Sequence, residues 1–230
     1  MNKLTQDGYI VSKKNKDNKD IIKIKADLTV TPERNADYGG EAESFPVYRE
    51  DSNNLIIPRY YGIKTLGKPK NMIKNNNFKV NFEFQGQLRG TQIEIAKAAL
   101  EKIKDKGGGI LQLHTGYGKT VLALYLACTL GLKTLIIVHK TFLQDQWFDR
   151  IKKFTNANIG IIRQKKTDVE GKDIVIGMLQ SISMIDYDPE IFKDFGLVIC
   201  DECFTGDTLI NTSFGPMKIE NLYNLWLSKE

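Results

Sequence analysis

Between residues 87 and 202, helical segments alternate with short apolar runs. The helical patterns are QLRGTQIEIAKAALEKIKDK, VLALYLACTL and TFLQDQWFDRIKKF, and the apolar runs are ILQL, TLIIVHK, IGIIRQ, DIVIGML and LVICDE. Strands that alternate with helices pack best as a parallel sheet, because each connecting helix can bury its apolar face against that sheet. The alternation therefore predicts an α/β domain with a parallel sheet and covering helices, in which ILQL is a short buried strand.

The segments before and after this region differ from it in composition and in hydrophobic pattern. Residues 1–80 are rich in Lys, Asn and Asp, and their apolar alternation is short, as in IIKIK and in FPVYRE to LIIPRYYG. This pattern predicts a small β-containing N-terminal accessory region. At the other end, DTLINT and PMKI around SFG are typical of a hairpin, and IENLYNLWL predicts a short helix.

Composition limits the compartment and the partners. The formal net charge of +5 permits a polyanionic partner such as DNA or RNA but does not require one. Cys128, Cys200 and Cys203 are too few and too irregularly spaced for a disulfide framework, which favours a reducing compartment. The longest apolar run, VLALYLACTLGL, is too short to span a bilayer, and MNKL does not open a secretory signal. We expect a cytoplasmic protein with no membrane partner.

The stretch LHTGYGKT has the features of a phosphate-binding loop. Gly116 and Gly118, which follow Thr115, allow a tight turn that points backbone amides at phosphate oxygens, and the next helix adds its positive end. Lys119 supplies a mobile cation for the β and γ phosphates, and the Thr120 hydroxyl can ligate Mg2+. The loop predicts ATP with Mg2+ as cofactors, with a glycine-rich turn that only caps a helix as the structural alternative.

An acidic pair supplies the other half of the predicted nucleotide site. LVICDE ends in Asp201 and Glu202, where a buried strand would deliver carboxylates to a magnesium nucleotide. Asp201 would hold Mg2+ directly or through water, and Glu202 would orient and deprotonate the attacking water. Acidic pairs at strand ends are common, so this assignment depends on the presence of Lys119 upstream.

The order of these motifs resembles that of superfamily 2 helicases, of the DEAD/DEAH-like type found in large DNA viruses and phages. A strict P-loop has Gly where this chain has Leu113, and a Thr-Gly-x-Gly-Lys-Thr loop after a non-Gly residue resembles motif I of that family. QLRGTQ resembles the Q motif, which implies that Gln92 reads the adenine edge. NLIIPRYYG resembles a segment that precedes the motor in these helicases. The resemblance implies a RecA-like ATP-binding lobe over residues 81–202.

Two further stretches resemble nucleic-acid contacts of the same family. VHKTFLQDQW resembles motif Ia, in which Lys140 and Thr141 would contact phosphate while Trp147 packs inward. GMLQS resembles the next contact and implicates Gln180 and Ser181. Packing of a strand against a helix is the alternative for each stretch. The resemblance implies DNA or RNA as a partner and leaves open which of them is bound, and the direction of translocation.

The sequence changes character at Cys203. Helicases of this type usually continue Asp-Glu with a small residue and His, often Cys-His, whereas Phe204 stands at the His position here. CFTGDTLINTSFGPMKIENL resembles the opening block of an intein, with Cys first, then Gly-Asp-Thr, a strand, a Gly turn and a second strand. The resemblance implies that residues 203–230 are a short, β-rich N-terminal fragment of a split intein, preceded by a helicase N-extein.

The chemistry of protein splicing explains why Cys would stand first. The Cys203 thiolate is a good nucleophile near neutral pH and can attack the carbonyl carbon of Glu202 to form a thioester. The resemblance further implies a partner chain that carries the rest of the intein and the second motor lobe. Splicing with it would restore Asp-Glu-Cys-His across the junction.

Three interpretations of the whole chain are open. It is a trans-splicing precursor, a part of a helicase with a contiguous cis-splicing intein, or a nucleotide- or nucleic-acid-binding module without turnover. We expect the chain alone neither to splice nor to unwind, because its 230 residues contain no second motor lobe and no later intein blocks. We also expect the 28 residues from Cys203 onward to be largely disordered until the partner binds.

Overall fold

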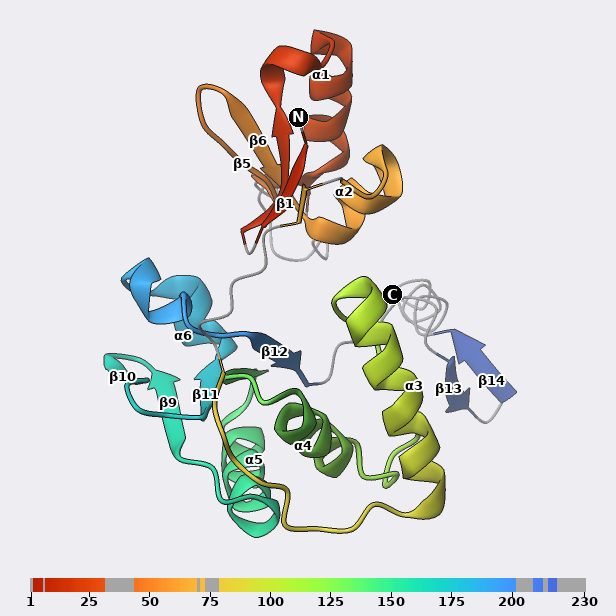
Figure 1. Ribbon diagram of the computed structural model, residues 1–230, viewed down its shortest axis with the longest axis vertical. Helices are drawn as coiled ribbons and strands as arrows, with labels where there is room; N and C mark the ends of the chain where they lie inside the picture. The colour runs from red at the N-terminus through yellow and green to blue at the C-terminus, as the bar shows by residue number, and fades with distance from the viewer. Residues whose placement is uncertain are drawn as a thin grey trace, which may run out of the picture. The chain divides into compact units, whose positions relative to one another are not determined.

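The computed structural model describes residues 2–5, 7–31, 44–69, 71–72, 79–201, 209–212 and 215–218. The chain divides into two compact units, Met1–Asn76 and Asn77–Glu230. In Figure 1 the first unit runs from red to orange and the second from yellow to blue.

The first unit is a small sheet with two helices. The strand order is β5 (Arg49–Glu50), β6 (Asn54–Ile57), β2 (Gly8–Ser12), β1 (Lys3–Thr5) and β7 (Asn71–Met72). Among the described strands of this sheet, only β1 and β7 pair in parallel. A separate antiparallel pair joins β3 (Thr29–Val30) to β4 (Phe45–Pro46). The helical elements are η1 (Lys13–Asn15), α1 (Asn18–Asp27) and α2 (Arg59–Leu66).

The accessory region contains more helix than the sequence predicted. IIKIK was expected to be β structure and lies instead in α1, where Ile21 and Ile24 are buried and Ile22 is 62% exposed. A spacing of three residues places both buried isoleucines on one face of a helix, and the five-residue stretch is too short to distinguish this from alternation. The expected β content is confirmed by β1, β2 and β6. LIIPRYYG divides into β6 and α2, with Pro58 between them.

The second unit contains the predicted parallel sheet. Its strand order is β10 (Lys166–Asp168), β9 (Ile159–Arg163), β11 (Ile174–Met178), β8 (Thr134–Val138) and β12 (Leu197–Cys200). The last four pair in parallel, and β10 is an antiparallel edge strand that the sequence did not indicate. The α/β domain is therefore confirmed, with a mixed sheet.

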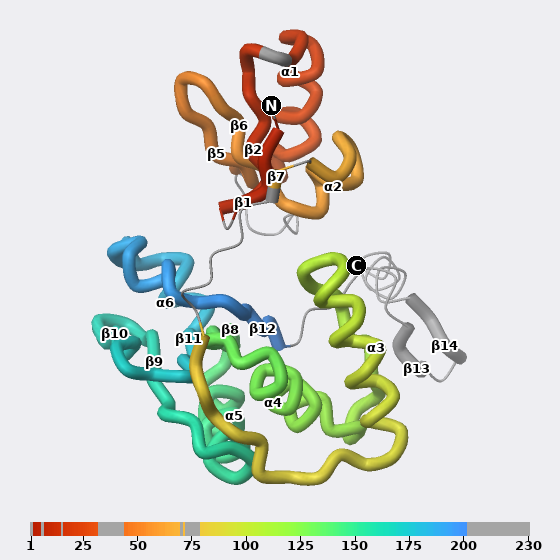
Figure 2. Tube along the Cα trace, in the orientation of Figure 1, coloured from red at the N-terminus to blue at the C-terminus, as the bar shows by residue number. Residues whose placement is uncertain are grey.

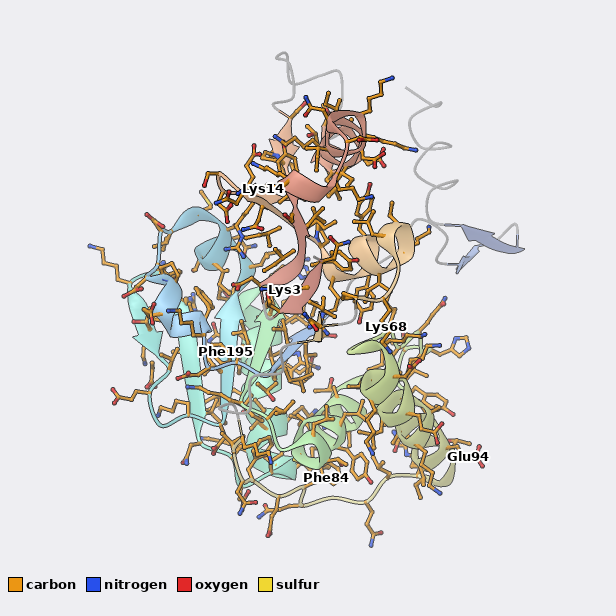
Figure 3. The ribbon with its side chains drawn as sticks, turned by 45° about the horizontal axis from the view of Figure 1, so that its top comes forward. Lys3, Lys14, Lys68, Phe84, Glu94 and Phe195 are labelled. Carbon is orange, nitrogen blue, oxygen red and sulfur yellow. The ribbon has the colours of Figure 1, made fainter. Side chains whose placement is uncertain are left out.

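Helices cover this sheet as expected from the sequence. The helical elements are α3 (Gly90–Lys106), α4 (Lys119–Leu130), α5 (Thr141–Phe154), α6 (Leu179–Met184) and η2 (Pro189–Phe192). Leu124 of α4 and Trp147 of α5 pack with Ile136 and Ile176 on one face of the sheet. Phe195, which is labelled in Figure 3, belongs with Leu135 to the cluster on the other face. Helix α3 lies against α4 through Ala96, Ala99 and Leu122. Among the described residues, no helix combines the length and apolar character needed to cross a membrane.

The prediction of a strand at ILQL is wrong. Residues 110–113 form no strand, Ile110 is 77% exposed, and only Leu113 packs against the α3–α4 cluster. An extended apolar segment becomes a strand only when a neighbour satisfies its backbone groups. In the described part of the chain no strand lies beside these residues, because the sheet ends at β12.

The region after Asp201 is described only in part. Leu209–Thr212 (β13) and Gly215–Lys218 (β14) pair as an antiparallel hairpin, which confirms the hairpin expected at DTLINT and PMKI. The predicted helix at IENLYNLWL lies outside the described residues. The expected disorder before partner binding stays a prediction.

Candidate nucleotide and nucleic-acid site

Three neighbouring parallel strands end at the same edge of the sheet. Val138 at the end of β8 pairs with Met178 of β11, and Ile137 pairs with Cys200 of β12. The predicted contacts Lys140 and Thr141 follow β8, Gln180 and Ser181 follow β11, and Asp201 follows β12. The path of these strands can be followed in Figure 2. Ligands of open α/β sheets commonly bind at the carboxyl edge, and the predicted residues lie at or next to this edge.

The phosphate loop leads directly into α4. Gly116 and Gly118 have φ of 80° and 83°, a left-handed conformation that favours glycine, and Gly118 is the N-cap residue of α4. No side chain caps the helix, and its first turn contains no acidic residue. The first amides of α4 are therefore available to an anion. Thr115 and Gly116 are exposed, and Thr120 is half-buried.

Gln92 connects α3 to this loop. Its Oε1 accepts from the Arg89 amide at 2.9 Å, and its Nε2 donates to the Tyr117 carbonyl at 2.7 Å. The side chain is buried, and both ends of its amide are used by these contacts. The role of Gln92 as the adenine reader stays a prediction. The bonds in place hold the backbone of the phosphate loop against the start of α3.

The Lys119 side chain is exposed next to the loop. Its Nζ donates to the Leu113 carbonyl at 3.3 Å, a long bond to the residue that precedes the loop. An exposed lysine with one weak partner can turn to a phosphate at little cost, because a Lys side chain has many rotamers.

Asp201 is fixed by two bonds at the end of β12. Its amide donates to the Ile137 carbonyl at 3.3 Å, and its Oδ2 accepts from Trp147 Nε1 at 2.7 Å. Sequence reasoning placed Trp147 in the core and missed this bond. The signal was the indole N–H itself, because a buried tryptophan usually needs an acceptor. Within the described residues, neither Lys119 nor Thr120 is hydrogen-bonded or ion-paired to Asp201.

The oxygen donors of the candidate site suit Mg2+, which takes part of its ligands from water and phosphate, better than a metal ion whose ligands all come from the protein. Mg2+ is usually bound by one or two carboxylates, waters and substrate phosphates. Asp201 and the Thr120 hydroxyl offer oxygen ligands of this kind, since among the described residues Asp201 Oδ1 and Thr120 Oγ1 take part in no hydrogen bond. No group of three or more His, Cys, Asp or Glu in the described part of the chain could hold a metal ion by itself.

The predicted nucleic-acid residues differ in accessibility. Lys140, Thr141 and Gln180 are exposed, and Gln180 Nε2 donates to the His139 carbonyl at 2.6 Å, which joins the ends of β8 and β11. Ser181 is buried, and its Oγ accepts from the Gln164 amide at 2.9 Å. The first three can meet a ligand as they stand, whereas the Ser181 hydroxyl is used within the fold. Glu202 and Cys203 lie outside the described residues.

The mixed sheet, the glycine-rich loop before α4 and the aspartate after β12 are typical of α/β nucleotide-binding proteins, and the similar sequences place the chain in the superfamily 2 helicase class. Comparison with protein families agrees with this class. Residues 85–208 match the family described as "Type III restriction enzyme, res subunit", and the chain belongs to that family.

Viral helicases are among the similar proteins. "Putative ATP-dependent RNA helicase L396" of Acanthamoeba polyphaga mimivirus is 40% identical over 235 residues, which cover 99% of this chain and 45% of the relative. "Putative helicase 161L" of Invertebrate iridescent virus 6 is 30% identical over 178 residues, which cover 70% of this chain and 40% of the relative. The chain thus spans less than half the length of each.

Solved structures give a weaker likeness. The Sulfolobus solfataricus SWI2/SNF2 ATPase core in complex with dsDNA aligns with a TM-score of 0.39 and 18% sequence identity. The alignment covers 56% of this chain and 33% of that one.

Proposed function

We propose that this chain is the N-terminal half of an ATP-dependent nucleic-acid helicase, interrupted after Glu202 by the N-terminal fragment of a split intein at residues 203–230. The helicase part is supported by the family and by the viral relatives. The observation that carries it is the carboxyl edge of the sheet, where Lys140, Gln180 and Asp201 follow three adjacent strands.

In the proposed motor, the phosphate loop and the carboxyl edge of the sheet both contribute residues that bind the nucleotide. The amides of residues 116–120 and the Lys119 ammonium bind the phosphates, and Thr120 and Asp201 hold Mg2+. Bound Mg2+ neutralises the charge that develops on the phosphate oxygens. Glu202 orients and deprotonates the attacking water. Lys140 and Thr141 contact the phosphates of DNA or RNA, with Gln180 and Ser181 at the adjoining strand end.

The intein part rests on the residues from Cys203 onward and is supported by the β13–β14 hairpin. The Cys203 Sγ attacks the carbonyl carbon of Glu202, so that a C–S bond forms as the C–N bond between the two residues breaks. The thiol proton goes to the amine that is released. Proximity and strain in the completed intein make this exchange productive.

A partner chain is supported by an exposed face of β12, the last strand of the described sheet. Parallel sheets are normally covered on both faces. Leu197 and Ile199 pack against the main core, but on the opposite face Val198 is 53% exposed and Cys200 is also exposed. We propose that the partner with the rest of the motor and intein covers this face. Two alternatives stand beside this proposal: a contiguous cis-splicing intein, and a binding module without turnover.

The test mixes the chain with a partner that carries the later intein blocks followed by Cys-His and a second lobe. Mass spectrometry should find a ligated protein with Glu202 joined to that Cys. Cys203→Ala should abolish the ligation, and Cys128→Ala, which removes a thiol of α4 that lies outside the proposed partner face, should not. Ligation that persists with Cys203→Ala would refute the acyl shift.

The motor part needs a separate measurement. Fluorescent ATP should bind the unaltered chain in Mg2+, and Lys119→Ala should weaken that binding at least tenfold, because a charge-assisted contact of about 1.5–3 kcal/mol is lost. Rapid ATP hydrolysis by the chain alone would contradict the need for a second lobe. Hydrolysis only after ligation would refute the binding module.

A further inference from the structure

The bond between Trp147 and Asp201 joins α5 to the end of β12 across 54 residues of sequence. Trp147 is 2% exposed and packs with Leu143 and Ile151 of its own helix. Asp201 is half-buried and lies directly after its strand. The indole is thus rigidly held by the core, and the carboxylate that it meets stands at the edge.

We propose that Trp147 is the positioning residue for the magnesium-binding carboxylate of Asp201. The proposal rests on the proposed motor function, which assigns Mg2+ to Asp201. The indole N–H holds Oδ2 at 2.7 Å, and in the described part of the chain Oδ1 accepts no hydrogen bond. One oxygen is therefore fixed, and the other is left for a cation or its water.

The chemistry of the indole suits this task. Tryptophan is a donor only, so it cannot compete with the carboxylate for the metal. It is also uncharged, whereas a lysine or arginine at this place would neutralise the carboxylate and repel Mg2+. Its two side-chain torsions are set by packing on Ile136 and Ile176, so the carboxylate is oriented before any cation arrives. Outer contacts of this kind typically change metal affinity by about 10–100-fold when removed.

The bond also fixes the position of the strand end relative to the helix. The Asp201 amide is bonded to Ile137 of β8, so the backbone is anchored by the sheet, and the side chain is anchored by α5. Loss of the indole N–H would free the carboxylate to rotate about its torsions while the backbone stays in place. The expected defect is therefore in metal binding and not in the strand.

The experiment measures Mn2+ binding by electron paramagnetic resonance on the full chain with a non-hydrolysable ATP analogue. Trp147→Phe should weaken Mn2+ binding about 10–100-fold, while affinity for the analogue in EDTA is unchanged. Ile162→Ala removes a buried side chain of β9 that belongs to the other core cluster and not to that of Trp147. It should disturb packing but leave Mn2+ affinity within about twofold of the unaltered chain, since changes without shared contacts act independently.

Two further variants separate the possible failures. If Trp147→Phe does not fold, replacement of Trp147 by benzothienylalanine keeps the bicyclic shape, lacks the N–H, and should show the same loss of Mn2+ affinity. If Asp201→Asn weakens Mn2+ binding but neither Trp147 variant does, the positioning role is overturned and the motor proposal stands. If Asp201→Asn has no effect, or the unaltered chain binds no Mn2+ with the analogue, the metal assignment of Asp201 fails, and the inference fails with it.

Discussion

Replacing Gly118 by alanine tests whether Gln92 holds the phosphate loop. Gly118 has φ of 83°, and a Cβ on this residue would lie 2.7 Å from Gln92 Nε2. Gly116, with φ of 80°, and Gly171, with φ of 64°, have nothing within 4 Å of the same position. All three substitutions force alanine into a left-handed conformation, at a cost of about 1–2 kcal/mol. Only Gly118→Ala also displaces the buried amide of Gln92.

The added cost follows from the bonds of Gln92. Its Nε2 cannot retreat from a new Cβ without leaving the Tyr117 carbonyl, 2.7 Å away. A hydrogen bond of this kind contributes about 1 kcal/mol net. Gly118→Ala should therefore destabilise the loop and the start of α4 by about 2–3 kcal/mol, which is about 1 kcal/mol more than either control.

Hydrogen exchange of the amides of α3 and α4, followed by mass spectrometry, measures these local free energies. An extra 1 kcal/mol corresponds to exchange that is about fivefold faster than in Gly116→Ala. The excess should disappear in the Gln92→Ala background, because the two positions share one contact. If Gly118→Ala destabilises the loop no more than Gly116→Ala does, or if the additional destabilisation persists in the Gln92→Ala background, Gln92 does not hold the phosphate loop.

Three further outcomes are expected. Ile176→Ala, which removes a side chain that is 1% exposed in the central strand β11, should lower the unfolding free energy by about 2–5 kcal/mol in urea titration, and a loss below about 1 kcal/mol would contradict the described core. Burial raises the pKa of the Cys128 thiol to about 12. At pH 8, iodoacetamide should therefore modify this thiol at least 100-fold more slowly in the folded chain than in urea. Equal rates would show that the thiol is exposed. Hydrogen bonds from Lys13 and then Lys25 lower the pKa of Glu50 below its ordinary 4.5, so the stability that ionised Glu50 contributes is present above pH 4.5 and is lost as pH falls through the lowered pKa. Glu50→Gln should remove this acid-dependent loss of hydrogen-exchange protection in β5 and β6. An unchanged loss would show that the contacts of Glu50 with Lys13 and Lys25 are not its cause.

The α/β domain could be predicted because long periodic segments leave little choice. The helices that begin at Gly90 and Thr141 carry apolar residues at helical spacing, and the helix that begins at Lys119 is apolar along almost its whole length. The strands β8, β9, β11 and β12 are mostly apolar. The failures lie where a short segment depends on its neighbours. Residues 110–113 have the composition of a strand, but no strand of the described part of the chain lies beside them. IIKIK is too short for its period to be recognised.

The candidate site divides in the same way. The motifs predicted that Lys140, Gln180 and Asp201 would follow strands of a parallel sheet. The structure adds that these strands are neighbours, so that their carboxyl ends meet. The sequence could not show that the Ser181 hydroxyl would accept from the Gln164 amide inside the fold. It also could not show that both ends of the Gln92 side-chain amide would be hydrogen-bonded within the protein. Such bonds depend on rotamers set by packing between distant segments, and no local pattern records them.

The two predicted halves of the nucleotide site are held in different ways, because the phosphate loop lacks the strand expected at residues 110–113, whereas Asp201 is held by the sheet and by a helix. Without a strand at residues 110–113, the phosphate loop is tied to α3 through Gln92, while Asp201 is tied to α5 through Trp147. Each tie uses an uncharged N–H donor, so neither neutralises a group that a magnesium nucleotide would need. The geometry of the proposed site is therefore set separately at the loop and at the sheet edge. Substitutions in one tie should change its own half of nucleotide binding, phosphate or metal, and leave the other half intact.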